Sequence, residues 1–332
     1  MIKFLKKTGL QDVIALIVIL VGIVVIMSLS SNLFLSPRNL TNLLIDSTTV
    51  GIIAVFSTML MIAGGLDLSV ASTAALCGVI IGVFQASLGI LPAVLIALAV
   101  GAMVGLVNGV LVTYVGINPL ITTLGMFSIA RGLAFVFSNG LTIPVFDLSG
   151  EHQAAYDKFT ILSEGSFLGL PYPVIAMLVL FALGLSILHL TSYGRAMYAI
   201  GGNELAAKMA ALPVKRYRVT AYVLSGLSAA IAAIFLTSRL YAADPRAAPG
   251  VELTVITAVI LGGTSLAGGK GNLVGTFLGV MILSTLLNGL RLQSTSTDLQ
   301  NIIQGLVLLA AVGFEQIRTG NVKLNIKKLF SK

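Results

Sequence analysis

Few residues in this 332-residue chain could carry chemistry, and they are scattered. The stretch from Gly263 to Gly271 has some likeness to a phosphate-binding loop. The GxxxxGK[ST] motif, however, needs Ser or Thr after the lysine, and here Gly271 follows Lys270. The glycine spacing differs as well, so we interpret these glycines as a tight turn between two helices. The chain is therefore not expected to hydrolyse a nucleotide.

The sequence offers no other catalytic or metal site. His152 and His189 stand apart and lack the HExxH spacing of a zinc site. Cys77 is the single cysteine and has no base beside it in sequence, which leaves covalent catalysis without a visible nucleophile. We expect no enzyme activity, no catalytic residue, no metal and no cofactor, and an enzyme acting inside a membrane stays as an alternative.

Polar residues inside apolar stretches are the remaining candidates. A charge near the centre of a bilayer costs several kcal/mol or more by most estimates, so such groups should face the interior of a helix bundle. They are Asp46, Asn108, Asn118, Arg131 and Asn288. Arg131 could donate hydrogen bonds beside a solute path, but we favour a structural pair with Asp46 or Asp67.

The composition indicates the kind of structure that holds these residues in place. Hydrophobic residues make up 57% of the chain and charged residues 10%, and the mean hydropathy is +1.03. Soluble chains carry roughly 25% charged residues, so most of this surface must face lipid. The net charge of +8 does not indicate nucleic acid, because basic and aromatic residues are not interleaved and tryptophan is absent.

About ten apolar segments can cross a hydrocarbon layer of about 30 Å, often starting with a proline at the first helical turn. The predicted fold is therefore all-α: a polytopic membrane helix bundle forming one transmembrane domain over residues 1–332. The predicted spans are 13–29, 43–63, 69–85, 91–114, 119–137, 172–190, 219–240, 253–266, 273–290 and 299–314.

Charge predicts the orientation of this bundle. Residues 139–170 carry four acidic side chains against Lys158, whereas residues 191–218 carry five basic side chains against Glu204. The positive-inside rule places the basic segment in the cytoplasm and the acidic segment in the periplasm. Ten spans from a basic cytoplasmic N-terminus also return the basic C-terminal tail to the cytoplasm.

The cytoplasmic segment contains the signals of a short helix. Asn203 is a good N-cap and Pro213 stops a helix, which predicts one from about Glu204 to Leu212. Its alanines would let a partner approach closely, although a solvated connector is the alternative. The residues expected at this contact are Gly202, Asn203, Glu204, Ala206, Ala207, Lys208, Ala211 and Pro213, with Glu204 and Lys208 paired at i and i+4.

A weak internal echo links residues 62–69 with residues 260–267, because both place a glycine pair where a span ends. Transporters often show repeats with broken helices near the solute path, but glycine-rich helix ends also recur by chance. Asp67 or Ser69 is expected to cap the third span. The residues predicted for the path or for helix breaks are Gly64, Gly65, Asp67, Ser69, Asn108, Asn118, Arg131, Gly262 and Gly263.

Three motifs occur in order: GGLDLS at 64–69, GGNExAA at 201–207 and VILGGTSLAGGKG at 259–271. Together they resemble the ribose, arabinose and related permeases of ATP-binding cassette (ABC) importers, over about residues 35–314. The resemblance implies a permease subunit in a bacterial inner membrane that moves a monosaccharide from periplasm to cytoplasm. It also implies three partners: cytoplasmic ATPase subunits, a periplasmic binding protein and a second permease. Ala211 departs from the usual glycine.

Two other functions stay open from the sequence. Permeases for nucleosides, furanone autoinducers or branched-chain amino acids share this general build. An ion-coupled secondary transporter would instead use buried carboxylates such as Asp46 and Asp67.

Overall fold

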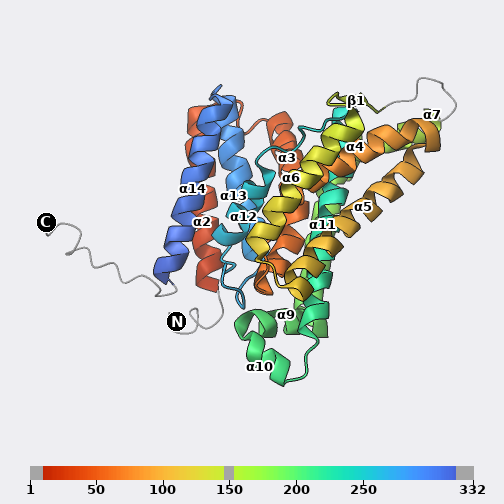
Figure 1. Ribbon diagram of the computed structural model, residues 1–332. Helices are drawn as coiled ribbons and strands as arrows, with labels where there is room; N and C mark the ends of the chain where they lie inside the picture. Colours follow the sequence, from red (N-terminus) through yellow and green to blue (C-terminus); the bar gives the residue numbers. More distant parts are fainter. Residues whose placement is uncertain (1–9, 146–152, 319–332) are drawn as a thin grey trace, which may run out of the picture.

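The structure is a computed structural model that describes residues 10–145 and 153–318. Helices dominate it and run side by side in one bundle (Figure 1). In its first half they are α2 (Leu10–Ser30), α3 (Pro37–Ile62), α4 (Val70–Leu88), α5 (Ile90–Val110), the π-helix η1 (Leu111–Val115), α6 (Pro119–Ser138) and α7 (Gln153–Glu164). In its second half they are α8 (Tyr172–Leu190), α9 (Ser192–Gly202), α10 (Glu204–Met209), α11 (Val214–Leu240), α12 (Val251–Leu261), α13 (Leu273–Leu292) and α14 (Thr297–Arg318).

Four two-residue strands form two small ladders. β1 (Ile143–Pro144) pairs antiparallel with β4 (Ala242–Ala243), and β2 (Ser166–Phe167) pairs antiparallel with β3 (Leu170–Pro171). β1 and α7 lie at one end of the bundle, and α9 and α10 lie at the other (Figure 1). We call these the β1 end and the α10 end.

Within the described residues, nine helices are long and apolar enough to cross a membrane. They correspond to nine of the ten predicted spans, so the helical membrane fold is confirmed. Lys3, Lys6 and Lys7, the tail after residue 318, and Asp147, Glu151 and His152 lie outside the described residues, so the structure does not test their predicted sides.

The eighth predicted span, 253–266, is wrong as a continuous membrane-crossing helix. α12 has eleven residues, or about 16 Å of helix, roughly half the hydrocarbon thickness. Residues 244–250, which we call the strap, contain two prolines and bring the chain from β4 to α12 without a helix. The chain thus passes from the β1 end to the α10 end by a strap and a short helix.

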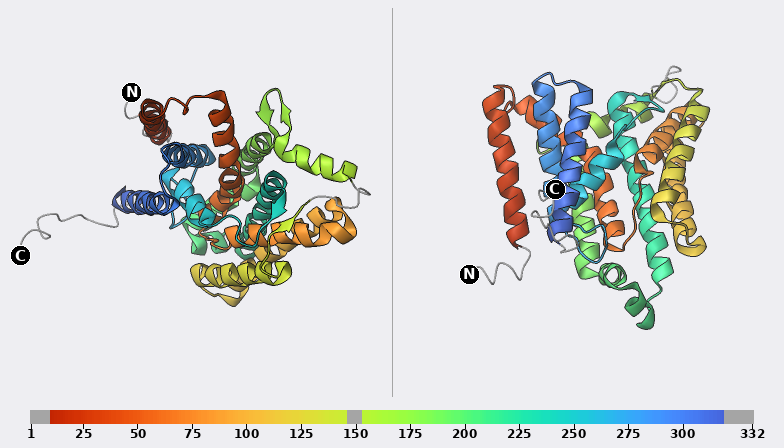
Figure 2. Two further views of the ribbon diagram at one scale, coloured as in Figure 1. Left: turned by 90° about the horizontal axis from the view of Figure 1, so that it is seen from above. Right: turned by 60° about the vertical axis from the view of Figure 1, so that its left-hand side comes forward.

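The core of the bundle is formed by α3, α4 and α11, which are buried over most of their lengths. α5 packs on α11 so closely that a Cβ on Gly101 would lie 2.6 Å from the Gly226 carbonyl oxygen. Small residues permit such backbone approach in membrane helices. α2 and α14 lie at the outside of the bundle, as both views in Figure 2 show.

Candidate functional site

Two helices end abruptly with the same local structure. α3 ends at Gly64 (φ +76°), where the Gly65 N–H bonds to the Leu60 carbonyl at 2.9 Å. α12 ends at Gly263 (φ +88°), where the Thr264 N–H bonds to the Val259 carbonyl at 3.2 Å. Both are Schellman motifs, in which glycine adopts the left-handed conformation without steric cost.

These motifs refine the internal echo found in the sequence. The sequence aligns Gly64 with Gly262, but Gly262 is still helical at φ −67°. In the structure, Gly64 instead matches Gly263, so the two helix ends correspond with a shift of one residue.

Asp67 lies at the centre of a buried polar cluster just after the end of α3. Its Oδ1 accepts hydrogen bonds from the Ser69 N–H at 2.9 Å, the Ser69 hydroxyl at 2.6 Å and the Asn108 amide at 3.5 Å. Its Oδ2 accepts from the Ser225 hydroxyl at 2.9 Å. In the described part of the chain no ion pair includes Asp67, so neutral donors alone satisfy the carboxylate.

The cluster fixes the bend between α3 and α4 to two other helices. Asn108 belongs to α5 and Ser225 to α11, and the Tyr222 hydroxyl donates to the Leu66 carbonyl at 3.1 Å. Three predicted path residues, Asp67, Ser69 and Asn108, are thus brought together. Ser225 and Tyr222 were missed, because a serine and a tyrosine within an apolar helix give no sequence signal of their own.

Ser69 occupies the N-cap position of α4, but its side chain makes no cap hydrogen bond. The prediction named Asp67 or Ser69 as the cap. The Ser69 hydroxyl donates to Asp67 and does not cap α4, whereas the Asp67 carboxylate accepts from the Ser69 N–H just before the helix.

Asn118 and Arg131 differ from expectation. Asn118 is exposed and caps α6 by accepting from the Leu120 N–H at 2.9 Å, so it does not face the bundle interior. Arg131 pairs with neither Asp46 nor Asp67, and the favoured structural pair is wrong. Its Nη1 donates to two carbonyls of the strap, on Pro245 at 2.7 Å and Ala247 at 2.9 Å.

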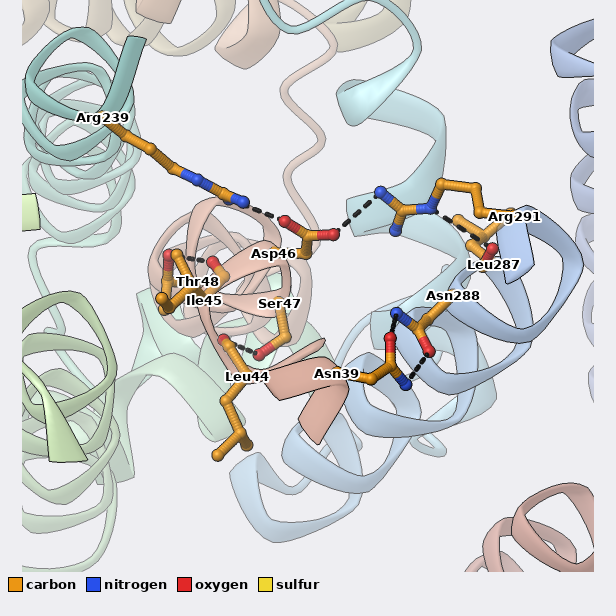
Figure 3. A network of polar contacts seen from close by, with 10 residues as sticks. All are labelled: Asn39, Leu44, Ile45, Asp46, Ser47, Thr48, Arg239, Leu287, Asn288 and Arg291. Carbon is orange, nitrogen blue, oxygen red and sulfur yellow. Dashed lines mark hydrogen bonds and ion pairs between the residues drawn. The ribbon is translucent and has the colours of Figure 1, made fainter. Parts of the chain in front are cut away.

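Asp46 belongs to a second polar network, at the β1 end (Figure 3). Its carboxylate bridges Arg239 of α11 at 2.6 Å and Arg291 of α13 at 2.8 Å. Beside it, the side-chain amides of Asn39 and Asn288 exchange two hydrogen bonds of 2.9 and 3.0 Å. The network joins α3, α11 and α13, and explains how Asp46 and Asn288 are satisfied inside predicted spans.

At the other end, α10 is built as predicted at its start but is shorter. The Asn203 side chain accepts from the Ala206 N–H at 3.0 Å, which confirms the N-cap. The helix ends at Met209, and not at Leu212, because Ala211 turns into the left-handed region at φ +57°. A preceding helix, α9, was not predicted.

Glu204 holds α10 in place through two cations. Its carboxylate pairs with Lys208 at 2.7 Å, which confirms the i, i+4 pair, and with Arg218 of α11 at 2.8 Å. Hydrogen bonds from Lys208 and Arg218 lower the pKa of Glu204 below its ordinary value of 4.5.

The surface that α10 presents differs from the predicted alanine contact. Ala207 is buried against Ala196, Ile200 and Val214, so it supports the helix from within. The large apolar side chains that α10 exposes are Leu205 (69% exposed) and Met209 (82% exposed), which stand four residues apart on one face, and Ala206 is exposed as well. An i, i+4 apolar pair on a short capped helix was the sequence signal that could have found them.

α9 contacts the end of α3 and the turn after α12 through backbone atoms. The Gly269 N–H donates to the Ile62 carbonyl at 2.8 Å, and Gly201 of α9 lies against both. A Cβ on Gly201 would stand 1.8 Å from the Ile62 oxygen and 2.4 Å from the Gly269 nitrogen. The Tyr198 hydroxyl also donates to the Gly271 carbonyl at 2.9 Å. We call this contact between α9, the end of α3 and the turn after α12 the interlock.

The interlock explains the glycine-rich segment that resembled a phosphate loop. Its Gly269 N–H donates to the Ile62 carbonyl, and its Ser265 N–H donates to the Lys270 carbonyl at 3.0 Å. These two N–H groups therefore already have partners within the chain. In addition, α13 starts only at Leu273, with Asn272 as its N-cap. The described residues contain no group of three or more His, Cys, Asp or Glu side chains that could hold a metal.

Comparisons with known proteins identify the family. The family model for the branched-chain amino acid transport system permease component matches residues 39–312. The chain is 40% identical over 291 residues to the ribose import permease protein RbsC of Bacillus subtilis (strain 168), covering 87% of this chain and 88% of that protein. It is 39% identical over 286 residues to the L-arabinose ABC transporter permease protein AraH of Azospirillum brasilense, covering 86% and 82%.

A further relative is the autoinducer 2 import system permease protein LsrD of Yersinia enterocolitica, 35% identical over 276 residues, which cover 82% of each chain. No solved structure matches this chain significantly. The family model spans most of the described bundle, including the Asp67 cluster, α10 and the interlock. The chain therefore belongs to the family of branched-chain amino acid transport system permease components.

Proposed function

We propose that the chain is the membrane-spanning permease subunit of an ABC importer that carries a monosaccharide such as ribose or arabinose into the cytoplasm. Relatives named as ribose and arabinose permeases support the substrate class. The observation that carries the mechanism is the interlock, because it links α9, the helix just before α10, to the end of α3 and to the turn after α12.

In this proposal the α10 end lies in the cytoplasm of a bacterium and the β1 end lies in the periplasm, with the bundle in the inner membrane. The basic segment 191–218 and the acidic segment 139–170 support this orientation. Both termini are then cytoplasmic.

The cytoplasmic ATPase subunit docks on α10 through Leu205 and Met209. These side chains are apolar and exposed to solvent, whereas Glu204 and Lys208 hold the helix in position. When the ATPase moves α10 and α9, the ends of α3 and α12 move with them. The backbone atoms of the interlock are in such close contact that α9 cannot shift without displacing both ends. A second permease subunit completes the path, and a periplasmic binding protein delivers the sugar.

An ion-coupled transporter is less well supported. Asp46 is held by two arginines, Arg239 and Arg291, so its carboxylate is not free to carry a proton or bind sodium. The chain itself makes and breaks no bonds in this scheme.

Reconstitution tests the proposal. The chain, its ATPase partner and the binding protein are placed in liposomes, and uptake of labelled D-ribose and L-arabinose is measured. We expect uptake to need ATP and both partners. Uptake driven by a proton or sodium gradient without ATP would contradict the proposal.

Orientation is tested separately by cysteine labelling in a Cys77→Ala background. Leu168 (88% exposed) and Met209 (82% exposed) lie at opposite ends of the bundle. An impermeant thiol reagent added outside intact cells should label Leu168→Cys and spare Met209→Cys. The reverse pattern would invert the orientation.

The relative named as an autoinducer 2 permease favours a second substrate class. Calorimetry on the binding protein that works with this chain distinguishes the two, because that protein selects the solute.

A further inference from the structure

We propose that the β2–β3 hairpin and α8 form a lipid-binding groove that holds one acyl chain of a phospholipid, and that the tip of the hairpin inserts into the membrane leaflet at the β1 end. The proposal goes beyond the transport function, because it depends only on the membrane fold. It starts from an apolar surface that the transport function does not use.

The hairpin has an unusual tip. Phe167 pairs with Leu170, and the two residues of the turn between them, Leu168 and Gly169, both have positive φ, at +53° and +80°. Two-residue turns of this kind favour asparagine followed by glycine, because a leucine side chain disfavours the left-handed region. The turn therefore carries a large apolar side chain at a position where the backbone prefers a small polar residue.

The apolar side chains of the tip are not buried within the chain. Leu168 is 88% exposed, and its neighbour Phe167 is 62% exposed. In water, such a pair would leave apolar surface hydrated at a free-energy cost. Among acyl chains the same side chains are favourably placed, since leucine and phenylalanine enter a membrane with a gain in free energy. A lipid environment thus favours leucine at a turn that otherwise favours asparagine.

The hairpin and α8 enclose an open apolar groove. Phe167, Leu168 and Leu170 form one wall, and one face of α8 over residues 175–182 forms the other. The volume of the groove is about 360 Å³, within the range of about 300–1,000 Å³ that is usual for small-molecule sites. Every residue that lines it in the described part of the chain is apolar. The groove therefore fits a hydrocarbon chain and not a polar ligand.

The groove lies at the depth of the hydrocarbon. α8 has 19 residues, or about 28 Å of helix, which is close to the hydrocarbon thickness of about 30 Å. Tyr172, its first residue, therefore lies at the membrane boundary, where tyrosine is enriched. Residues 175–182 follow about 5–15 Å below that boundary. To share a groove with them, the hairpin must lie back along α8 instead of projecting away from the membrane.

The base of the hairpin is fixed to α8 in this position. The Tyr172 N–H donates to the Gly165 carbonyl at 3.0 Å, and Pro171, at the end of β3, is buried. Seen from above, the hairpin stands at the rim of the bundle, on a different side from α14 (Figure 2).

Lipid is the occupant that the surroundings of the groove supply. Only a third of the most apolar stretch of α8 is buried within the chain, so the rest of this span faces the membrane. The outward backbone groups of the hairpin need water or lipid headgroups, which keeps its backbone at the interface while the tip side chains reach the acyl region. A phospholipid whose headgroup lies beside the hairpin backbone places an acyl chain in the groove.

Tryptophan fluorescence tests the depth of the tip. The chain contains no tryptophan, so Leu168→Trp reports from this position alone. The variant is placed in nanodiscs of phosphatidylcholine brominated on an acyl chain, which quenches fluorescence on contact. We expect quenching comparable to that of Val18→Trp on the exposed side of α2, and none for Met209→Trp on α10. Quenching of Leu168→Trp by aqueous iodide alone would place the tip in water, and protection from both quenchers would mean that protein covers it. Either result would overturn the proposal.

Retained lipid tests the groove itself. Native mass spectrometry counts the phosphatidylcholine molecules that stay on the purified chain in detergent. Ala182→Phe fills the groove, and Leu183→Phe is the matched control, because Leu183 is the next residue and does not line the groove. We expect Ala182→Phe to retain one molecule fewer than the wild-type chain, and Leu183→Phe to retain the wild-type number.

Leu168→Asn separates loss of lipid from loss of structure. Asparagine suits the turn better than leucine, so this variant keeps the hairpin and removes only the apolar tip. It should lose the same lipid molecule as Ala182→Phe. Equal lipid counts in the wild-type chain and all three variants would overturn the groove as a lipid site. Neither measurement involves transport, so failure of the proposed function would leave both results unchanged.

Discussion

Gly201→Ala is the sharpest test of the interlock. The added Cβ would stand 1.8 Å from the Ile62 carbonyl oxygen and 2.4 Å from the Gly269 nitrogen, both backbone atoms. Ordinary contacts of a Cβ start at about 3.4 Å. The backbones must therefore move apart by more than an ångström, which would break the 2.8 Å hydrogen bond between Gly269 and Ile62.

The expected magnitude follows from overpacking, which typically costs about 1–3 kcal/mol. If this free energy is added to the barrier for the coupled movement of α9, α3 and α12, the rate of transport drops about fivefold to a hundredfold. The assay is ATP-dependent uptake in liposomes, measured with binding-protein-stimulated ATP hydrolysis. Both should fall together, while the ATPase subunit still co-purifies, because Leu205 and Met209 are not touched.

Gly202→Ala is the matched control. Gly202 is the next residue of the same helix, and a Cβ there meets no atom within 4 Å. We expect wild-type uptake for this variant. Equal losses in both variants, or wild-type uptake by Gly201→Ala, would refute the role of the interlock.

Four further predictions follow from the site. Replacing Leu205 and Met209 together by serine should weaken ATPase binding in pull-down at least tenfold, since burying each side chain contributes about 1.5–3 kcal/mol; undiminished binding would place the docking surface elsewhere. The lowered pKa of Glu204 means that its ion pairs contribute fully above about pH 4.5 and are lost as the pH falls through that lowered pKa. ATPase binding should weaken over the same range, and Glu204→Gln should abolish that pH dependence. Ser225→Ala removes a donor from the buried Asp67 carboxylate and should destabilise the chain by about 1–3 kcal/mol, seen as a lower Tm in detergent, whereas Ser87→Ala on an exposed site should not. Ala211→Gly should raise the Tm, because glycine relieves a left-handed residue at φ +57° by up to about 1 kcal/mol.

The sequence determined the features that depend on neighbours in the chain. Apolar length, N-terminal prolines and the Asn203 cap act within one helix, so nine spans and the start of α10 were predicted from local patterns. The Glu204–Lys208 pair is local for the same reason. Motifs of a few residues also carried the family resemblance, and the glycines in them end helices through their own local conformation.

Tertiary structure alone decided which residues meet across the bundle. Arg131 binds carbonyls more than a hundred residues away, and Asp67 binds Ser225 from another helix. Ala207 turned inward although its sequence context resembles that of Ala206, since α9 supplies an apolar surface that the sequence does not reveal. The length of α12 was likewise decided by the strap, whose path depends on Arg131 and Gln304. These contacts depend on how the helices pack, and helix packing is a property of the whole chain, whereas caps and charge pairs depend on residues only a few positions apart.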